Sequence, residues 1–218
     1  MILNKLKDLK HRLKLQLTDS VNKKDEFDPK VYNAKQFNRP KAPYYALAKA
    51  ANAILKPKSV IDVGCANGFT IEWWLKHGVD ARGIEGAKAA FKLMPAKVRP
   101  RVKLWDLRRS LPAGRRYDLV VFTEVAEHIK PKHEKIMLEN VVGLVGQYLL
   151  ISWSDKWDDY KGTPKQEHFN PRPKSYVKRR LESMGLTFVP GLTDKLNLKL
   201  TSGAAFSHWQ NNLLIFKR

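Results

Sequence analysis

The sequence predicts an α/β fold in which helices cover both faces of a mainly parallel sheet. From residue 59 onward, short apolar segments alternate with helical segments, which is the pattern of successive βαβ units. The first of these strands runs directly into a glycine-containing turn, a common place for a ligand in such sheets. The chain has 218 residues, 43% of them hydrophobic, so it can bury one core of its own.

The expected elements follow from the apolar pattern and from the residues that end helices. Residues 44–55 are alanine-rich and are followed by Lys56 and Pro57, which favours a helix that stops there. Apolar, β-branched runs such as residues 117–123 favour strands. Together these patterns give strands at 59–63, 80–85, 101–105, 117–123, 148–153, 186–189 and 212–216, and helices at 70–77, 87–94, 131–142 and 174–184.

The first 43 residues are expected to form a separate segment. Residues 1–17 carry leucine and isoleucine at intervals of three and four, flanked by lysines, which predicts a basic amphipathic helix. This helix either packs on its own domain or docks on a partner protein, RNA or a membrane surface. Residues 18–43 are polar and contain three prolines, which favours an extended arm. The expected organisation is therefore 1–43 as helix and arm, and 44–218 as the α/β domain.

The charge of the chain is strongly positive. Lysine and arginine number 41 against 21 aspartates and glutamates, a formal net charge of +20 at pH 7. Such a field attracts nucleic acid, with RNA favoured here, or another polyanion. Solubility or an acidic protein partner is the simpler explanation. Residues 121–160 are a net acidic stretch within this basic chain.

Cysteine usage and hydropathy restrict the class of protein. Cys65 is the single cysteine, so an intrachain disulfide and a zinc site with several thiolates are excluded. No apolar run reaches the roughly 18 residues that a membrane-spanning helix needs. Lysine and arginine interrupt the first residues, so no secretory signal is visible. We expect a cytoplasmic protein without a membrane span.

The first motif with chemical meaning is VIDVGCANGF at residues 60–69, where an apolar strand meets Gly64, Ala66 and Gly68 before a helix. Glycines let the backbone turn tightly and approach a ligand. Glu85 ends the next strand, 21 residues after Gly64, where a carboxylate can accept both hydroxyls of a ribose. Neither a full G-x-G-x-x-G nor a P-loop is present, which favours a nucleoside-like ligand without a pyrophosphate. The alternative is an ordinary strand–helix turn with a surface glutamate.

The second motif is Glu124-x-x-Glu127-His128, directly after the strand at 117–123. In a helix these three side chains would share one face. His128 could then act as a general base, or the three could bind a hard divalent ion such as Mg²⁺. The third interpretation is that the acids only cap and solvate a helix start.

A third group lies in the long loop after residue 153. His168, in the segment QEHFN (166–170), could join His128 across the site or remain a surface histidine. Aromatic residues interleaved with lysine and arginine in this region could stack bases, or could simply pack. These aromatic residues are Trp153, Trp157, Tyr160 and Phe169.

Four segments in order, VIDVGCANGF, GIE (83–85), LWDL (104–107) and YDLVVFTEVAEHI (117–129), resemble the class I S-adenosylmethionine-dependent methyltransferases. The resemblance covers about residues 44–218. It implies a Rossmann-like, doubly wound, mostly parallel seven-stranded sheet with an antiparallel last strand, and S-adenosylmethionine as cofactor. The family usually has glycine where this chain has Ala66. By resemblance, the turn holds the methionine end of the cofactor, Glu85 the ribose, and the next segments the adenine; the residues so implied are Asp62, Gly64, Cys65, Ala66, Gly68, Glu85, Asp106, Leu107 and Thr123.

The E-x-x-E-H motif followed by a later histidine also resembles the metal-dependent small-RNA 3′-end 2′-O-methyltransferases. That resemblance implies that Glu124, Glu127, His128 and His168 bind the metal. The same motif also occurs in methyltransferases that act on small molecules.

Three functions therefore remain open. The first is S-adenosylmethionine-dependent methylation of RNA, on oxygen rather than nitrogen because a hydroxyl needs the deprotonation that histidine and acids can assist. The second is methylation of a sugar or another metabolite. The third is a non-catalytic RNA-binding or assembly subunit on a methyltransferase scaffold, because fold alone does not guarantee activity.

Overall fold

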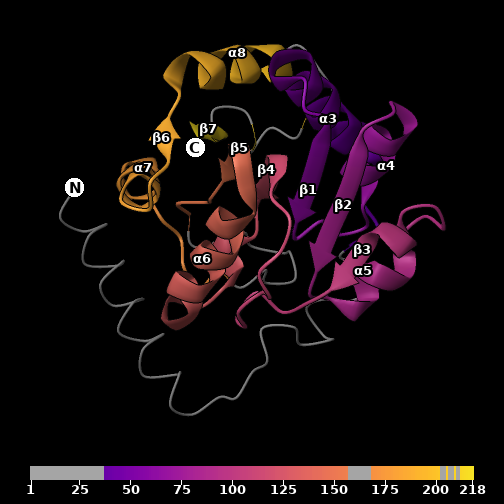
Figure 1. The fold of residues 1–218 in the computed structure, drawn as a ribbon, viewed down its shortest axis with the longest axis horizontal. Coiled ribbons are helices and arrows are strands. Elements are labelled where there is room, and N and C mark those ends of the chain that lie inside the picture. The colour runs from indigo at the N-terminus through magenta and orange to yellow at the C-terminus, as the bar shows by residue number, and fades with distance from the viewer. Residues whose placement is uncertain (1–36, 157–167, 202–204, 206–208, 210–211) are drawn as a thin grey trace.

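A computed structural model describes residues 37–156, 168–201, 205, 209 and 212–218 of the chain (Figure 1). The expected basic helix at 1–17 and most of the expected arm lie outside these residues. So do Trp157, Tyr160 and residues 161–167. The division of the chain at residue 43 therefore stays a prediction.

Seven strands form one sheet in the order β3-β2-β1-β4-β5-β7-β6. Strands β1 to β5 pair in parallel, and β7 is antiparallel to both β5 and β6, so the expected antiparallel last strand is confirmed. The strands are β1 (Ser59–Val63), β2 (Asp80–Glu85), β3 (Val102–Leu104), β4 (Tyr117–Thr123), β5 (Val145–Ser152), β6 (Thr187–Phe188) and β7 (Leu214–Lys217).

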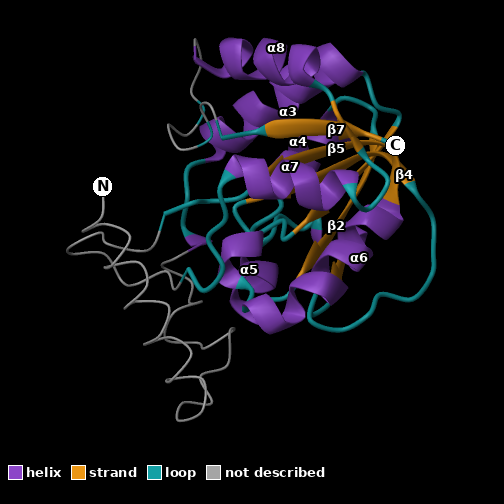
Figure 2. Ribbon diagram, turned by 90° about the vertical axis from the view of Figure 1, so that its left-hand side faces the viewer, coloured by secondary structure: helices purple, strands orange, loops and turns teal. Residues whose placement is uncertain are grey.

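Helices cover both faces of this sheet, as Figure 2 shows for α3 and α8 on one side and α6 on the other. The helices are α3 (Lys41–Leu55), α4 (Phe69–Lys76), α5 (Lys88–Leu93), α6 (Glu134–Leu144), α7 (Lys174–Glu182) and α8 (Pro190–Thr201), with single 3₁₀ turns at Arg99–Arg101, Ala126–His128 and Pro131–His133. Two hydrophobic cores result: α3, α4 and α8 close one, and α6 and α7 close the other.

Strand β1 shows why the sheet is buried on both sides. All five of its residues are buried. Val60 packs into the core under α3 and α4, whereas Ile61 and Val63 pack into the core under α6. Successive side chains of a strand point to opposite faces, so a nearly continuous apolar run is what a central parallel strand needs.

Two helices differ from expectation. The helix expected from residue 44 begins at Lys41, inside the expected arm, because Pro43 in the first turn needs no intrahelical hydrogen bond. Helix α8 was not expected, because Pro190 and Gly191 resemble a turn; in the structure the proline begins the helix, and Leu196 and Leu200 are buried on one face. Within the described part of the chain, no helix is long and apolar enough to cross a bilayer.

Two glycines near the start of β5 give a test of this packing. A Cβ atom on Gly146 would lie 2.8 Å from the carbonyl oxygen of Tyr117 in β4, whereas a Cβ on Gly143 in α6 meets nothing within 4 Å. We expect Gly146→Ala to lower the free energy of unfolding by about 1–3 kcal/mol. Gly143→Ala should raise it by up to about 1 kcal/mol, since alanine favours a helix. Urea unfolding of both variants measures this, and equal midpoints would contradict the β4–β5 register.

Candidate functional site

The glycine turn between β1 and α4 is fixed by backbone hydrogen bonds to β2. The N–H groups of Gly64 and Cys65 both donate to the carbonyl of Ile84, at 2.8 and 3.1 Å. Gly64 has φ +77°, and a Cβ there would lie 2.3 Å from Cγ2 of Val125. Glycine is therefore required both by its backbone conformation and by this contact. The turn and the segment after β4, expected separately from sequence, lie against each other.

Glu85 lies where the sequence places it, at the end of β2 and against the turn. Its Oε2 accepts the N–H of Ala66 and its Oε1 the N–H of Ala87, both at 2.7 Å. The backbone N–H of Gly86 also lies close to this carboxylate. A carboxylate has about four acceptor positions, so it can still accept a ribose hydroxyl beside these N–H groups. Burial raises the pKa of Glu85 to about 7, although these N–H groups oppose the shift.

Ala66 adopts φ +49°, in the left-handed region where glycine is usual. The chain therefore accepts some backbone strain at the position where it departs from the family. The same N–H that donates to Glu85 holds this conformation in place.

Asp62 is buried in β1 and hydrogen-bonded by the hydroxyl of Thr70 from α4. Burial raises the pKa of Asp62 to about 7, and the bond from Thr70 opposes this. Cys65 is also buried, and burial together with Asp62 and Glu85 raises the pKa of its thiol well above the usual value. The thiol therefore stays protonated and is a packing group.

Three residues at the turn were missed from sequence. Thr70 is one. Asn67 is another: its Nδ2 donates to the carbonyl of Phe37 at 2.9 Å, while its Oδ1 is buried and accepts no hydrogen bond from the residues that the structure describes. The third is Tyr44, which packs edge-on against Phe69. Burial raises the pKa of Tyr44 to about 12, so its phenol remains a donor. Of these three, only Asn67 lies between the glycines of the sequence motif, so it alone could have been singled out from the sequence.

Asp106 and Leu107, expected beside the adenine, follow β3. Leu107 is buried, and its carbonyl accepts Nδ2 of Asn140 at 3.0 Å. Asp106 is paired with Arg108, whose Nη2 lies 2.7 Å from Oδ2. Partial burial acts to raise the pKa of Asp106, but the hydrogen bonds from Arg108 outweigh this effect and hold the pKa below its usual value. An adenine amine would have to share this carboxylate with Arg108, which the sequence did not indicate.

The segment after β4 does not form the helix face considered from sequence. Thr123 ends β4 in register with Ser152, and Glu124 then has φ +54°. Oε1 of Glu124 accepts the hydroxyl of Ser152 at 2.6 Å and Nδ2 of Asn212 at 3.3 Å. Instead of an α-helix, a short 3₁₀ turn, Ala126–His128, comes next. A strained backbone at such a site is typical of functional segments.

Glu127, His128 and His168 come together. One ligand atom from each lies within 4.8 Å of those of the other two, while Glu124 is not among the residues so grouped in the described chain. The two imidazole rings are edge to face, with centroids 4.9 Å apart. The expected meeting of His168 with His128 is thus what the structure shows.

Glu127 is the most unusual group in this cluster. Its side chain is fully buried, and neither carboxylate oxygen has a well-formed hydrogen bond within the described residues, although the backbone N–H of Ser154 lies close enough to lower its pKa. Burial, and then the nearby carboxylate of Glu124, raise the pKa of Glu127 well above its usual value. A carboxylate in this position either holds a proton or needs a cation.

The His168 segment is held by its backbone. Nδ1 of His168 lies 2.7 Å from the carbonyl of Lys156, and since a carbonyl only accepts, Nδ1 carries the proton. In the neutral ring the lone pair is then on Nε2. The N–H groups of Phe169 and Asn170 donate to the carbonyl of Glu127 at 2.7 and 2.9 Å, which keeps the two segments together.

Glu134, at the start of α6, anchors this segment further and was not identified from sequence. Its carboxylate accepts Nδ2 of Asn170 at 3.0 Å, Nη2 of Arg172 at 3.1 Å, and the hydroxyl of Tyr176. It therefore ties the loop that bears His168 to α6 and α7.

The described aromatic residues of the loop mainly pack. Trp153 is 2% exposed, and its Nε1 donates to the carbonyl of Asn170 at 2.6 Å, so it does not offer a stacking surface. Phe169 is half-buried, with Nζ of Lys130 lying 5.3 Å from its ring centre.

Comparison with known proteins agrees with this architecture. The methyltransferase domain family matches residues 32–190, which begins inside the arm expected from sequence. A search of curated protein sequences gave no match.

Several solved structures share the fold. A SAM-dependent methyltransferase from Archaeoglobus fulgidus is 16% identical with a TM-score of 0.58, covering 84% of this chain and 97% of that chain. Magnesium protoporphyrin IX methyltransferase from Synechocystis PCC 6803, solved with bound SAM, is 16% identical with a TM-score of 0.55, covering 79% and 76%. The methyltransferase domain of bacterial CtHen1 is 13% identical with a TM-score of 0.53, covering 81% and 96%.

The family match extends over more than half of the chain, and the order of strands and the turn geometry fit it. The chain therefore belongs to the class I S-adenosylmethionine-dependent methyltransferase family.

Proposed function

We propose that this protein transfers a methyl group from S-adenosylmethionine to a hydroxyl of RNA, with a divalent ion held by Glu127, His128 and His168. The observation that carries the proposal is the fully buried Glu127 carboxylate, which has no well-formed hydrogen bond within the described residues and lies beside two imidazoles. A buried carboxylate so placed costs several kcal/mol unless a cation compensates it. A cation is also what would assist loss of a proton from a hydroxyl.

The residues at the turn fit the cofactor. Glu85 would accept the ribose hydroxyls, and Asp62 and Oδ1 of Asn67 would receive the ammonium group at the methionine end. When bound, the cofactor would supply the methyl group: its methyl C–S bond would break as the C–O bond forms, S-adenosylhomocysteine would leave, and the hydroxyl proton would pass to solvent. The contribution of the chain is to bind and align the two reactants and to keep water out.

The donor set also fits an ion. A carboxylate suits Mg²⁺ and Mn²⁺, and imidazoles suit transition metals better than Mg²⁺. Because Nδ1–H of His168 donates to the carbonyl of Lys156, Nε2 is the nitrogen that would bind the ion. Backbone carbonyls often orient metal-binding histidines in this way. We therefore name Mn²⁺ and Mg²⁺ as the ions to test.

A polyanionic acceptor is favoured by the charges next to the cluster. Partial burial, followed by Lys132 and Arg108, lowers the pKa of His133, which shows that cations gather around the 3₁₀ turn preceding α6. Lys130 lies over Phe169 in the same region. These side chains can hold phosphates close to the proposed ion.

Glu85→Gln tests the cofactor site. The amide oxygen can still accept one backbone N–H, but the charge is lost, so we expect S-adenosylmethionine to bind roughly 10- to 100-fold more weakly. Isothermal titration calorimetry measures this. Glu139→Gln, an exposed change on α6, is the matched control and should bind as the wild type does. Equal affinity in Glu85→Gln would remove Glu85 from the cofactor site.

The same variant has a pH signature without cofactor. The pKa of Glu85 is about 7 in the folded protein against an ordinary 4.5, so the folded state holds the proton more tightly. The stability that this gives is complete below about pH 4.5 and is lost as the pH rises through 7. As the pH rises from 4.5 to 7, the free energy of unfolding of the wild type should therefore fall relative to that of Glu85→Gln, by a few kcal/mol in total.

Glu127→Gln tests the ion. Without metal, the folded wild type at pH 8 must either keep a proton on this buried carboxyl or bury its charge, so the variant should have the higher melting temperature. With millimolar Mn²⁺ the wild type should gain stability and the variant should gain little, because one ligand is lost. EDTA should abolish methyl transfer by the wild type. An Mn²⁺ response that is equal in both proteins, or absent in both, would contradict the assignment; Glu139→Gln again serves as control.

The acceptor is tested by label transfer. Radioactive S-adenosylmethionine is incubated with the protein and with separate RNA, protein and metabolite fractions of a cell extract. We expect label in RNA, recovered after digestion as a 2′-O-methyl nucleoside. Label confined to the metabolite fraction would instead indicate a small-molecule methyltransferase, and absence of any label at saturating cofactor would indicate a scaffold without activity.

A further inference from the structure

Exposed arginines line the edge of the sheet opposite the candidate site. Arg101 precedes β3, Arg82 lies near the start of β2, Arg115 and Arg116 precede β4, and Arg218 follows β7. Parallel strands all begin at this edge, and the antiparallel β7 ends there. We call these five residues the arginine edge.

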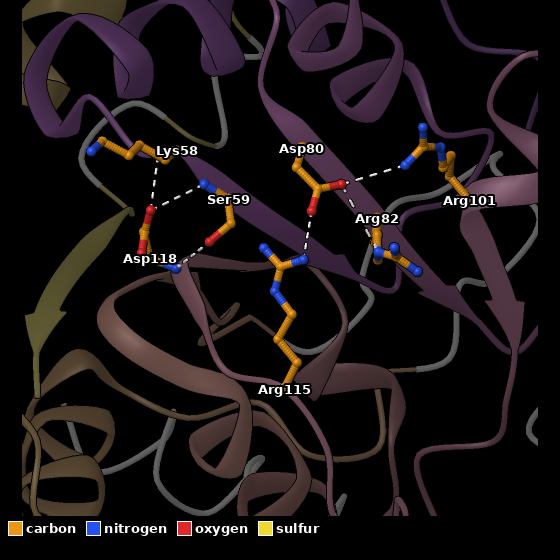
Figure 3. Close-up of polar contacts among 7 residues, drawn as sticks. All are labelled: Lys58, Ser59, Asp80, Arg82, Arg101, Arg115 and Asp118. Atoms are coloured by element: carbon orange, nitrogen blue, oxygen red, sulfur yellow. Dashed lines mark hydrogen bonds and ion pairs between the residues drawn. The ribbon is translucent and has the colours of Figure 1, made fainter.

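Three of the arginines surround one carboxylate (Figure 3). Nη1 of Arg115 lies 2.6 Å from Oδ2 of Asp80, Nη1 of Arg101 lies 3.4 Å from Oδ1, and Nε of Arg82 lies 4.0 Å from Oδ1. A single carboxylate balances only one of these positive charges. The group therefore keeps an excess positive charge in a small, solvent-accessible area.

Asp118, the second acid in this region, does not compensate that excess, because its carboxylate accepts hydrogen bonds from the backbone instead. Oδ2 of Asp118 accepts the N–H groups of Lys58 and Ser59 at 2.9 and 3.1 Å. Its own N–H donates to the hydroxyl of Ser59 at 3.0 Å. Figure 3 shows the side chain of Lys58 extending away from Asp118. Lys58 thus adds to the positive charge of the edge.

Two further arginines, Arg116 and Arg218, lie close together at the β7 end of the arginine edge. The N–H of Arg218 donates to the carbonyl of Gln147 at 2.9 Å, and its Nη2 to the carbonyl of Val142 at 2.5 Å. Partial burial and the nearby guanidinium of Arg116 lower the pKa of Arg218. The two arginines are therefore close enough to repel each other.

Ion pairing with Asp80 contributes little to stability here, although Arg115 also lies over the ring of Tyr117, 4.9 Å from its centre. The side chains of Arg82, Arg101 and Arg115 are 45–49% exposed, and ion pairs that exposed contribute about 0–1 kcal/mol each. Packing several guanidiniums around one acid adds repulsion. Guanidinium groups do suit phosphates, which they bind with two parallel hydrogen bonds. The arrangement is thus better suited to an external polyanion than to internal pairing.

The length of the edge points the same way. From β3 to β7 the sheet takes five steps between neighbouring strands. At about 4.8 Å a step, the arginines extend over a distance on the order of 20 Å. A chain of successive phosphates can meet several of them at once, whereas a single small anion cannot.

We propose that the arginine edge binds the phosphate backbone of RNA, as a docking surface on the far side of the sheet from the methyltransferase site. The inference extends the proposed function, because it rests on RNA as the acceptor, but binding here needs neither cofactor nor ion. A membrane is a poorer partner. The large hydrophobic side chains exposed in the described chain are Leu93, Leu104 and Leu198, which lie in α5, at the end of β3 and in α8, away from this edge.

The test is binding of a fluorescent single-stranded RNA of about 20 nucleotides to the full chain without cofactor, followed by anisotropy over a range of salt concentrations. In the triple variant Arg82→Gln, Arg101→Gln and Arg115→Gln we expect at least a tenfold loss of affinity at 0.1 M salt. The slope of log K against log salt should fall by about 2, since each phosphate contact on a single strand contributes about 0.7.

Two control variants separate local from general charge effects. Lys49→Gln, Lys135→Gln and Lys195→Gln together remove the same charge from exposed positions on α3, α6 and α8, and should lose less than threefold. Lysine at the three arginine positions keeps the charge without the forked donors, so it should keep most of the salt slope and lose part of the affinity. Thermal unfolding of each variant shows that the fold is retained.

Several outcomes would overturn the inference. These are equal losses in the two glutamine triple variants, unchanged RNA binding in the arginine variant, and tighter binding of the wild type to polyglutamate or to phosphatidylserine vesicles than to RNA. The proposed function fails in a different way. RNA binding through the edge without any methyl transfer would contradict the methyltransferase proposal alone, and methylation of RNA with undiminished binding in the arginine variant would contradict the edge alone.

Discussion

The burial of carboxylates at the carboxyl ends of neighbouring strands is the constraint on which this site depends. Asp62, Glu85 and Glu127 are each at most 6% exposed. Thr70 supplies a hydrogen bond to Asp62, and backbone N–H groups supply them to Glu85, but Glu127 has no well-formed hydrogen bond within the described residues. Burying a charge is costly unless it is paired. The ionised forms of these carboxyls therefore favour a positively charged partner, and both the sulfonium of S-adenosylmethionine and the proposed divalent ion are positive.

The sequence predicts those parts of the fold that depend on local pattern. The bounds of β1 and β4 agree with expectation because largely apolar runs closed by turn residues favour buried parallel strands. Those of β2 also agree, although its segment DARGIE is mostly polar and was placed by the helix stop at Gly78 before it. Glu85 was located by its spacing from the glycine turn, which reflects the length of one strand–helix–strand unit. The approach of His168 to His128 was a weaker inference, and it depended on both segments lying at the same edge.

The rest could not be predicted because it depends on contacts between distant segments. Glu124 leaves the helical path because Ser152 of β5 and Asn212 near the C-terminus bind its carboxylate and backbone. Arg108 pairs with Asp106 two residues away, a choice that the conformation of the loop decides. The left-handed backbone of Ala66 likewise depends on Glu85, a residue of the next strand.

In the proposed complex, the two edges of the sheet would contact different parts of an RNA acceptor. β4 has seven residues, so at about 3.3 Å each the arginines before it lie roughly 20 Å from the acids after it. Exposed charges are screened over about 8–10 Å at physiological salt. Arg115 therefore cannot neutralise Glu127, and in the proposed complex it would contact phosphates distant from the reacting hydroxyl. Compensation for Glu127 would have to come from charges at its own edge, such as the proposed ion and the sulfonium of the cofactor.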